Sequence, residues 1–175
     1  MTLIERVKQG TNTPEVEHVA RTEGVTVEHV IDGLVDGTIV IPANPLHTSL
    51  KPFGFGKGLR TKVNANLGTS SDSCDVDREL RKLKTAIECG ADAVMDLSTG
   101  GDITAIRRRL IAESTVTFGT VPIYQAGIKA IDGRGSIVDM TADDMFAAIE
   151  ENARDGVDFV TVHCGVTLAA IARLR

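Results

Sequence analysis

The sequence predicts an α/β fold in which helices cover a parallel β-sheet, preceded by a small helical region. Strand-like and helix-like segments alternate from residue 59 onward in this chain of 175 residues. Gly90 and Gly156 each end a predicted helix just before a strand. A weak internal repeat, residues 89–96 and 155–162, shows the same order of helix end, glycine, aspartate and strand. The alternation fits two architectures, a doubly wound sheet and part of a βα barrel.

The first 37 residues are predicted to be helical. One helix begins at Asn12–Glu15, where a capping side chain precedes a proline and an acidic residue. A second short helix has Thr26 near its start and Gly37 near its end. The β-branched residues 38–41 then predict a short strand, and repeated proline and glycine keep residues 43–58 irregular.

The later elements follow from caps and apolar spacing. The expected strands are 60–66, 91–97, 119–124 and 157–163, and the expected helices are 76–89, 103–111, 126–131, 141–152 and 166–174. Asp75 and Asp102 are suited to cap the first two of these helices, in which apolar residues recur at helical spacing. Thr141 with Asp144 resembles a capping box. Pro122 makes the third strand irregular, and most of residues 125–140 remain unassigned.

The composition excludes several classes of protein. A formal charge of −5 gives no general attraction to nucleic acid or to an anionic membrane. The apolar runs are far shorter than the roughly 20 residues of a membrane span, and the N-terminus lacks the apolar core of a signal peptide. A hydrophobic fraction of 42% is enough for a buried core. We therefore expect a soluble, cytoplasmic protein that binds neither nucleic acid nor a membrane.

The cysteines predict neither disulfides nor a metal site. Cys74, Cys89 and Cys164 are too few and too far apart for a disulfide framework. No Cys-x-x-Cys or His-x-x-x-His spacing occurs in the sequence. Cys164 has no basic neighbour in sequence to stabilise a thiolate, so we expect it to be buried as a small hydrophobic side chain.

Four residues that can contact a ligand recur near the C-terminal ends of the predicted strands. They are Asn66, Met95, Tyr124 and His163, which lie 29, 29 and 39 residues apart, about one βα unit each. Because parallel α/β folds build their sites at this end of the strands, we predict that the four meet in one cavity. Taken singly, each also suits a structural role, as a turn former, a core residue, a packed ring or a hydrogen-bonded histidine.

Other polar residues favour structural roles. Asp92 and Asp158 open strands at the opposite end and are expected to form turns. The Arg107–Arg109 run is expected to be a solvated helix face, because the inward side of that helix is Ile and Leu. Ser98–Asp102 follows a strand and opens a helix, so its backbone N–H groups could receive a phosphate, although the carboxylate of Asp102 would repel it.

Five segments, two of them eight and nine residues long, carry a resemblance to a known family. They are Ile41–Asn44, Gly58–Asn66, Ala93–Gly100, Gly119–Gln125 and Thr161–Val166. In them the chain resembles phosphomethylpyrimidine synthase, the radical S-adenosylmethionine enzyme family of thiamine biosynthesis, and the likeness extends in order over essentially all 175 residues. The resemblance implies the N-terminal part of a (βα)8 TIM-like barrel. Residues 1–37 would be the helical N-terminal region, and residues 38–175 an incomplete barrel of about four to five strands.

The resemblance also implies a reaction. Enzymes of this family are radical lyases that rearrange 5-aminoimidazole ribotide to hydroxymethylpyrimidine phosphate, with a [4Fe–4S] cluster that cleaves S-adenosylmethionine and a divalent metal, zinc. The family residues that bind the ribotide match Asn66, Met95, Tyr124 and His163. The family's metal-binding histidines and cluster cysteines have no counterpart here and are expected beyond Arg175. We therefore expect this chain alone to bind no metal and to be inactive.

Two departures from the family pattern leave other functions open. Pro45–His47 stands where Asn-His is expected, and Phe53–Gly56 is unusual. A close relative, 5-hydroxybenzimidazole synthase, converts the same ribotide in anaerobic cobalamin biosynthesis. The chain could also be a non-catalytic half-barrel that only binds substrate. Because four or five strands cannot close a barrel of eight, we expect the chain to pair with a second copy, to be continued by further chain or to rearrange its sheet, and of these we expect a homodimer.

Overall fold

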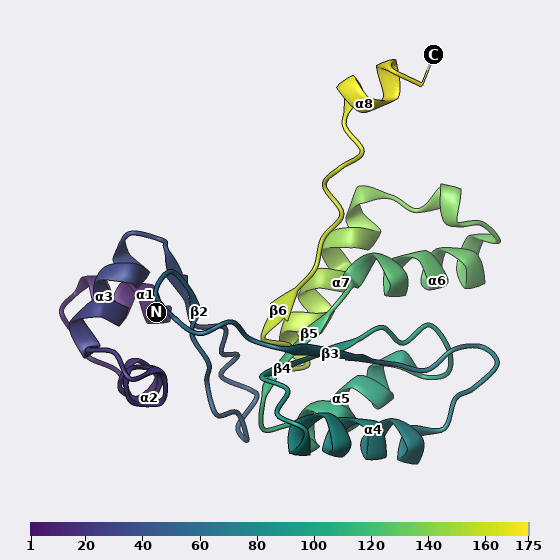
Figure 1. The fold of residues 1–175 in the computed structure, drawn as a ribbon. Coiled ribbons are helices and arrows are strands. Elements are labelled where there is room, and N and C mark those ends of the chain that lie inside the picture. Colours follow the sequence, from purple (N-terminus) through teal and green to yellow (C-terminus); the bar gives the residue numbers. More distant parts are fainter. Residues whose placement is uncertain (175) are drawn as a thin grey trace.

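In the computed structural model, which describes residues 1–174, three helices and a two-stranded ribbon form a lobe at one side of the molecule (Figure 1). The helices are α1 (Leu3–Lys8), α2 (Pro14–Glu23) and α3 (Val27–Val35), and the ribbon pairs β1 (Ile39–Val40) with β2 (Phe55–Gly56) antiparallel. Each helix begins after a threonine whose hydroxyl accepts a backbone N–H, namely Thr2, Thr13 and Thr26. Buried aliphatic side chains of all three helices and of β1 form one hydrophobic cluster, so this lobe has a core of its own.

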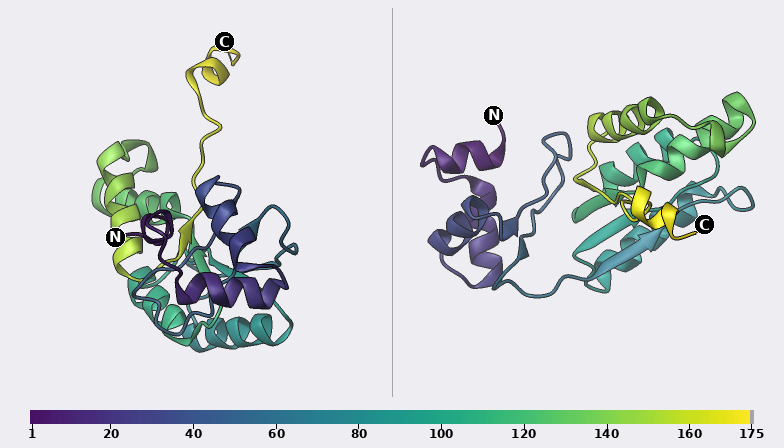
Figure 2. Two further views of the ribbon diagram at one scale, coloured as in Figure 1. Left: turned by 90° about the vertical axis from the view of Figure 1, so that its left-hand side faces the viewer. Right: turned by 90° about the horizontal axis from the view of Figure 1, so that it is seen from above.

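The rest of the chain forms a parallel sheet with helices between the strands. Its strands are β3 (Asn64–Leu67), β4 (Ala93–Asp96), β5 (Thr117–Thr120) and β6 (Phe159–Val160), in that spatial order. The helices are α4 (Val76–Glu88), α5 (Ile103–Glu113), α6 (Pro122–Arg134) and α7 (Ala142–Arg154), with a 3₁₀ turn, η1 (Ile137–Asp139), after α6. A short helix, α8 (Leu168–Ala172), follows β6 and lies apart from the other elements (Figures 1 and 2).

This arrangement confirms the predicted α/β fold with a parallel sheet. The strands follow one another across the sheet in chain order. Residues 1–174 form an open sheet with two edges, and no closed barrel is formed within them. None of the helices in residues 1–174 has the length and apolar character needed to cross a membrane.

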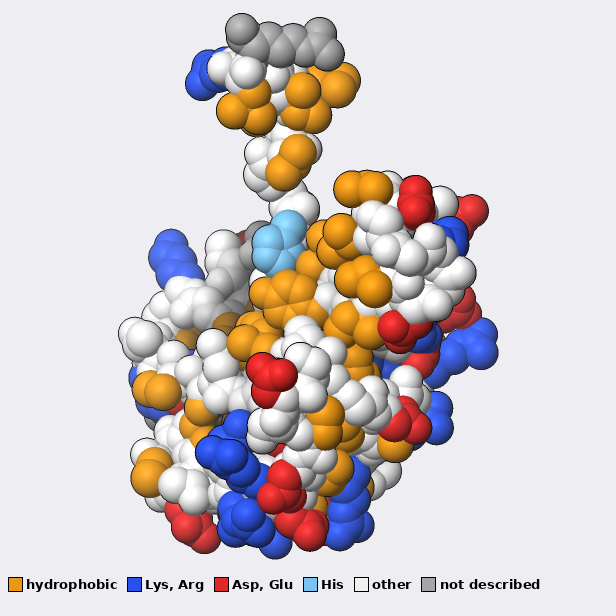
Figure 3. Space-filling view, turned by 90° about the vertical axis from the view of Figure 1, so that its right-hand side faces the viewer, with side chains coloured by type: hydrophobic (Ala, Val, Ile, Leu, Met, Phe, Trp, Pro, Cys, Tyr) orange, Lys and Arg blue, Asp and Glu red, His pale blue; other side chains and the backbone are white. Residues whose placement is uncertain are grey.

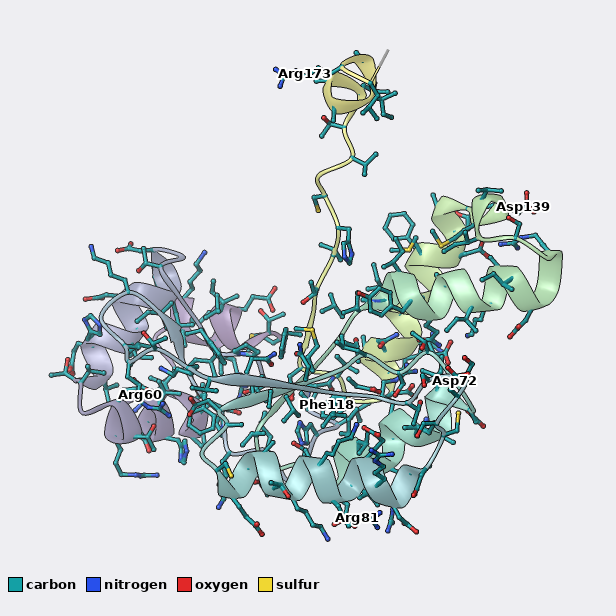
Figure 4. All side chains as sticks on the ribbon, turned by 45° about the vertical axis from the view of Figure 1, so that its right-hand side comes forward. Arg60, Asp72, Arg81, Phe118, Asp139 and Arg173 are labelled. Atoms are coloured by element: carbon teal, nitrogen blue, oxygen red, sulfur yellow. The ribbon has the colours of Figure 1, made fainter. Side chains whose placement is uncertain are left out.

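The two faces of the sheet differ in character. Leu67, Val94 and Phe118 point to the side covered by α4 and α5, where they form the main hydrophobic core with buried residues of both helices. Figure 4 shows Phe118 at the centre of the molecule and Arg81 pointing outward from α4. Because side chains alternate along a strand, the intervening residues of each strand point to the opposite face. Within residues 1–174 that face carries the exposed side chains of Asn64 and Asn66.

Several predicted boundaries are wrong. The third strand ends at Thr120, because Pro122 begins α6 rather than interrupting a strand, and Tyr124 therefore lies in a helix. The first strand begins at Asn64 instead of residue 60, and the last is confined to Phe159–Val160. The unassigned stretch around residues 125–140 is mostly α6 and η1, and the terminal helix is shorter than expected.

The prediction that the Arg107–Arg109 run forms a solvated helix face is wrong for one of its three residues. The side chains of Arg108 and Arg109 are 65% and 60% exposed, but that of Arg107 is only 1% exposed. Arg107 forms an ion pair with the buried carboxylate of Asp155, at the end of α7. The prediction failed because this partner is 48 residues away in sequence, so the spacing within α5 could not reveal it.

Candidate functional site

A row of neighbouring positions crosses the open face of the sheet, the one opposite α4 and α5. Asn66 lies opposite Met95, Met95 opposite Gly119, and Gly119 opposite Phe159. Asn66 is exposed, and its Oδ1 accepts a hydrogen bond of 3.0 Å from Asn64 Nδ2. Met95 is half-buried, and its Sδ accepts a hydrogen bond of 3.7 Å from the hydroxyl of Thr161. Asn66 and Met95, two of the four predicted residues, are therefore side by side.

Tyr124 and His163, the other two, contact each other just beyond the C-terminal ends of β5 and β6. Their ring centroids are 6.2 Å apart with the planes tilted by 42°, a spacing at which rings of this kind attract each other. Tyr124 is 38% exposed and His163 is exposed. Thr161, two residues before His163, links this pair to Met95. The structure thus brings the four residues to one end and one face of the sheet, where they line an open surface rather than a closed cavity.

Phe159 was missed by the sequence analysis. Its ring covers Gly119, where an added Cβ would lie 2.2 Å from the ring. Figure 3 views the molecule from the side of α6 and α7 and shows hydrophobic side chains gathered on that surface. The available signal was the pairing of a glycine in one predicted strand with an aromatic residue in the next, which indicates a ring packed on the backbone.

Replacing Gly119 with Ala is expected to destabilise the protein by about 1–3 kcal/mol, because the new methyl group forces the Phe159 ring away from the sheet. Denaturant unfolding measures this loss. Gly133→Ala in α6 is the matched control, since no atom lies within 4 Å of its Cβ position, and it should stabilise slightly. Equal effects of the two substitutions would contradict this account of Gly119.

The opposite end of the sheet is held by two aspartates, as their predicted structural role requires. Asp92 accepts the backbone N–H of Val63 at 2.9 Å and pairs with the guanidinium of Arg60. Asp158 accepts the backbone N–H groups of Phe118 and Asn44 at 2.7 and 2.8 Å. The two aspartates occupy equivalent places in the internal repeat, so the repeat reflects a shared strand-to-strand contact.

His47 is a further partner of the Asp158 carboxylate. Its Nδ1 lies 2.7 Å from Asp158 Oδ2, its Nε2 lies 2.9 Å from the carbonyl oxygen of Ser114, and the side chains of both His47 and Asp158 are fully buried. Burial lowers the pKa of His47, but the Asp158 carboxylate and the Ser114 carbonyl outweigh it and hold this pKa above its ordinary value. The unusual Pro45–His47 segment is therefore part of the scaffold, at the end of the sheet away from Tyr124 and His163.

The stability contributed by His47 is expected to fall as the pH rises. The pKa of His47 is higher in the folded state than in the unfolded state, where it is about 6.5. The stability that His47 contributes is therefore complete below pH 6.5 and is lost as the pH rises through the folded-state pKa. The difference in unfolding free energy between the wild type and His47→Gln should therefore narrow from pH 6 to pH 8.5. Gly133→Ala, which changes no titratable group, should show no such trend. A difference that stays constant or widens would contradict the assignment.

Two of the backbone N–H groups in the loop after β4 are already bonded within the protein. The N–H groups of Ser98 and Thr99 are bonded to Asp96 Oδ1 and to the carbonyl oxygen of Thr69. Asp102 uses its carboxylate to cap α5. Burial raises the pKa of Asp96, although its bonds to Ser98 oppose this. The loop therefore packs against residues 68–74 and supports the fold.

The cysteines do not form a metal site in the part of the chain that the structure describes. Cys74, Cys89 and Cys164 are all free and exposed, so the predicted burial of Cys164 is wrong. Among residues 1–174, no three His, Cys, Asp or Glu side chains come close enough to hold a metal ion. A [4Fe–4S] cluster needs three or four converging thiolates, so the described residues do not fit one.

Comparison of the chain with known proteins shows the family to which it belongs. Residues 2–175 match the model of the radical SAM ThiC family. The chain belongs to this family. It is 53% identical over all 175 residues to a phosphomethylpyrimidine synthase of Desulforamulus reducens and 55% identical to one of Moorella thermoacetica, covering 40% of each. It is 54% identical to the protein of that name from Thermodesulfovibrio yellowstonii, covering 41%. The chain therefore spans about two fifths of the length of these radical SAM ThiC relatives.

Proposed function

We propose that the protein carrying this chain is a phosphomethylpyrimidine synthase, which rearranges 5-aminoimidazole ribotide to hydroxymethylpyrimidine phosphate for thiamine biosynthesis. The observation that carries the proposal is the identity of 53–55% over the whole chain to enzymes of that name. The sheet would be part of a (βα)8 barrel. Its strands follow in chain order, whereas a doubly wound sheet reverses its order at a switch point.

The open face would bind the ribotide through the four residues at the C-terminal ends of the strands. The amide of Asn66 can exchange hydrogen bonds with polar groups of the ribotide, and Met95 offers an apolar surface to the imidazole ring. The phenol of Tyr124 and the imidazole of His163 can each donate or accept a hydrogen bond. Because these side chains are at least partly accessible, a ligand can reach all of them without rearrangement of the sheet.

The cofactor chemistry would come from elsewhere in the protein. In a radical SAM enzyme, a bound iron–sulfur cluster and S-adenosylmethionine supply the radical that starts the reaction. Because the described cysteines and histidines do not converge, we assign neither the cluster nor zinc to residues 1–174. The proposed contribution of this part of the chain is to bind and orient the ribotide.

Product analysis tests the proposed reaction. The purified protein, including any sequence that follows Arg175, is reconstituted anaerobically with iron and sulfide and supplied with the ribotide and S-adenosylmethionine. Hydroxymethylpyrimidine phosphate supports the proposal. 5-Hydroxybenzimidazole would assign the protein to the cobalamin branch. Ribotide binding without turnover, in a preparation shown to contain the cluster, would leave only a substrate-binding role.

Replacing His163 with Ala is expected to weaken ribotide binding by roughly 1–3 kcal/mol, the cost of leaving a buried polar group of the bound ligand unpaired. Isothermal titration of the same protein with the ribotide, without S-adenosylmethionine, measures this directly. His29→Ala in α3 is the control, because His29 is exposed on the N-terminal lobe. Unchanged affinity in the His163 variant would remove this residue from the proposed site.

We further propose that the protein is a homodimer. The support is the exposure of several large apolar residues of η1 and α7, among them Val138 and Phe146. Sedimentation equilibrium of the purified protein at several concentrations measures the mass. A monomeric mass at every concentration would exclude the dimer.

A further inference from the structure

Helix α6, which carries Tyr124, begins differently from the other α-helices of residues 1–174. Its N-cap residue is Val121, which has no side chain able to accept a hydrogen bond, and Pro122 follows at the first helical position. The other seven α-helices are each capped by a threonine or aspartate side chain. The N–H group of Tyr124 donates to the carbonyl oxygen of Val121 at 3.0 Å, but no side chain caps this turn, so the turn that holds Tyr124 lacks the side-chain fixation that the other helices have.

The residue after Tyr124, Gln125, fixes the first turn of α6 through its own side chain. Its side chain is buried, with 4% of the residue exposed. Its Oε1 accepts two hydrogen bonds, at 2.9 Å from Arg107 Nη1 and at 2.8 Å from Asn152 Nδ2. One amide oxygen thus joins the first turn of α6 to α5 and to α7.

Both donors are themselves fixed. Arg107 and Asn152 are each 1% exposed. Arg107 is held by the carboxylate of Asp155, and Asn152 also donates to the carbonyl oxygen of Ala148 at 2.6 Å. Since the donors cannot move independently of their helices, the position of the Gln125 oxygen is determined by the packing of α5 and α7.

We propose that Gln125 is a positioning residue for Tyr124. Successive residues of a helix point about 100° apart, so Gln125 is directed inward to its two donors while Tyr124 is directed outward to His163, at 6.2 Å. Because the two residues are adjacent in the helix, fixing the side chain of Gln125 sets the direction in which Tyr124 points. This proposal rests on the proposed function, in which Tyr124 contacts the ribotide.

A double-mutant cycle on ribotide affinity separates this role from a purely structural one. Gln125→Met keeps the size of the side chain and removes the accepting oxygen, and Tyr124→Ala removes the ring that it is proposed to position. The dissociation constant of the ribotide is measured by titration in the wild type, both single variants and the double variant, using the protein with any sequence that follows Arg175. Gln125→Glu, which keeps the accepting oxygen, is the conservative variant.

Gln125→Met is expected to weaken binding about tenfold in the wild-type background and not at all in the Tyr124→Ala background, a coupling within the range for residues that share a network. Gln125→Glu should bind nearly as the wild type does. Equal losses in the two backgrounds would show that Gln125 acts through general stability and would overturn the proposal. If Tyr124→Ala itself leaves the affinity unchanged, the ligand role in the proposed function fails, and the positioning role fails with it.

Loss of folding in the Gln125→Met variant would not end the test. Asn152→Ala removes one of the two donors and leaves the hydrogen bond from Arg107 in place. Circular dichroism and thermal unfolding identify the variants that remain folded. The same coupling to Tyr124, with a smaller loss of about threefold, is then expected. An uncoupled loss in a folded Asn152→Ala variant would contradict the proposal.

Discussion

Replacing Asp158 with Ala is expected to destabilise the protein by about 3–5 kcal/mol, the range for a buried ion pair that loses one partner. The substitution leaves His47 buried without its carboxylate and frees the backbone N–H groups of Phe118 and Asn44. Asn44 and His47 lie between β1 and β2 of the N-terminal lobe, and Phe118 lies in β5, so the carboxylate joins the two parts of the chain. Urea unfolding of the variant and the wild type at pH 6, where His47 is charged in the native state, gives the difference.

Asp72→Ala is the matched control for this change. Asp72 lies on the exposed loop after β3, at the position labelled in Figure 4, and its removal should alter the unfolding free energy by less than about 0.5 kcal/mol. A loss below 1 kcal/mol for Asp158→Ala would mean that water or a neighbouring group replaces the carboxylate, and would contradict its role in the scaffold.

Replacing Arg107 with Leu should cost about 3 kcal/mol, at the lower end of the range for a broken buried pair. The loss is smaller than for Asp158 because Arg108 Nε still donates to Asp155 Oδ1 at 2.6 Å. The measurement is again the free energy of unfolding by denaturant.

Arg109→Leu offers a control on the same helix. Arg109 differs from Arg107 in burial rather than in type, with 60% of its side chain exposed and a pair of 3.6 Å to Glu113. An exposed pair of this kind contributes at most about 1 kcal/mol. Similar losses for Arg107→Leu and Arg109→Leu would contradict the different roles that the structure gives them.

The sequence predicted those parts of the fold that depend on local signals. The threonine and aspartate caps, the capping box at Thr141 and the alternation of helix with strand all occur in the structure. Tyr124 was placed on a strand because Val121, Ile123 and Tyr124 all favour strands. The competing signal was Pro122, since proline is frequent at the first position of a helix.

The parts that could not be predicted depend on distant partners. Nothing near Arg107 in sequence indicates burial, because its acceptors Asp155 and Gln125 lie 48 and 18 residues away. His47 is likewise buried by contacts to residues more than 60 positions distant. The four candidate ligand residues were selected because they recur about once per βα unit near the ends of the predicted strands. In a parallel sheet these ends lie together, so the spacing in sequence was enough to group the four residues.

The paired aspartates at the N-terminal end of the sheet have a consequence for folding fidelity. Asp92 accepts the main-chain N–H of Val63, the residue just before β3, and Asp158 accepts that of Phe118 in β5. A slip of one residue between two such strands would turn every side chain of one strand to the other face. The strands here are two to four residues long, so few ladder bonds resist a slip. The Asp92 carboxylate therefore favours the alignment of β3 with β4 that places Asn66 opposite Met95, and the Asp158 carboxylate favours the alignment of β5 with β6.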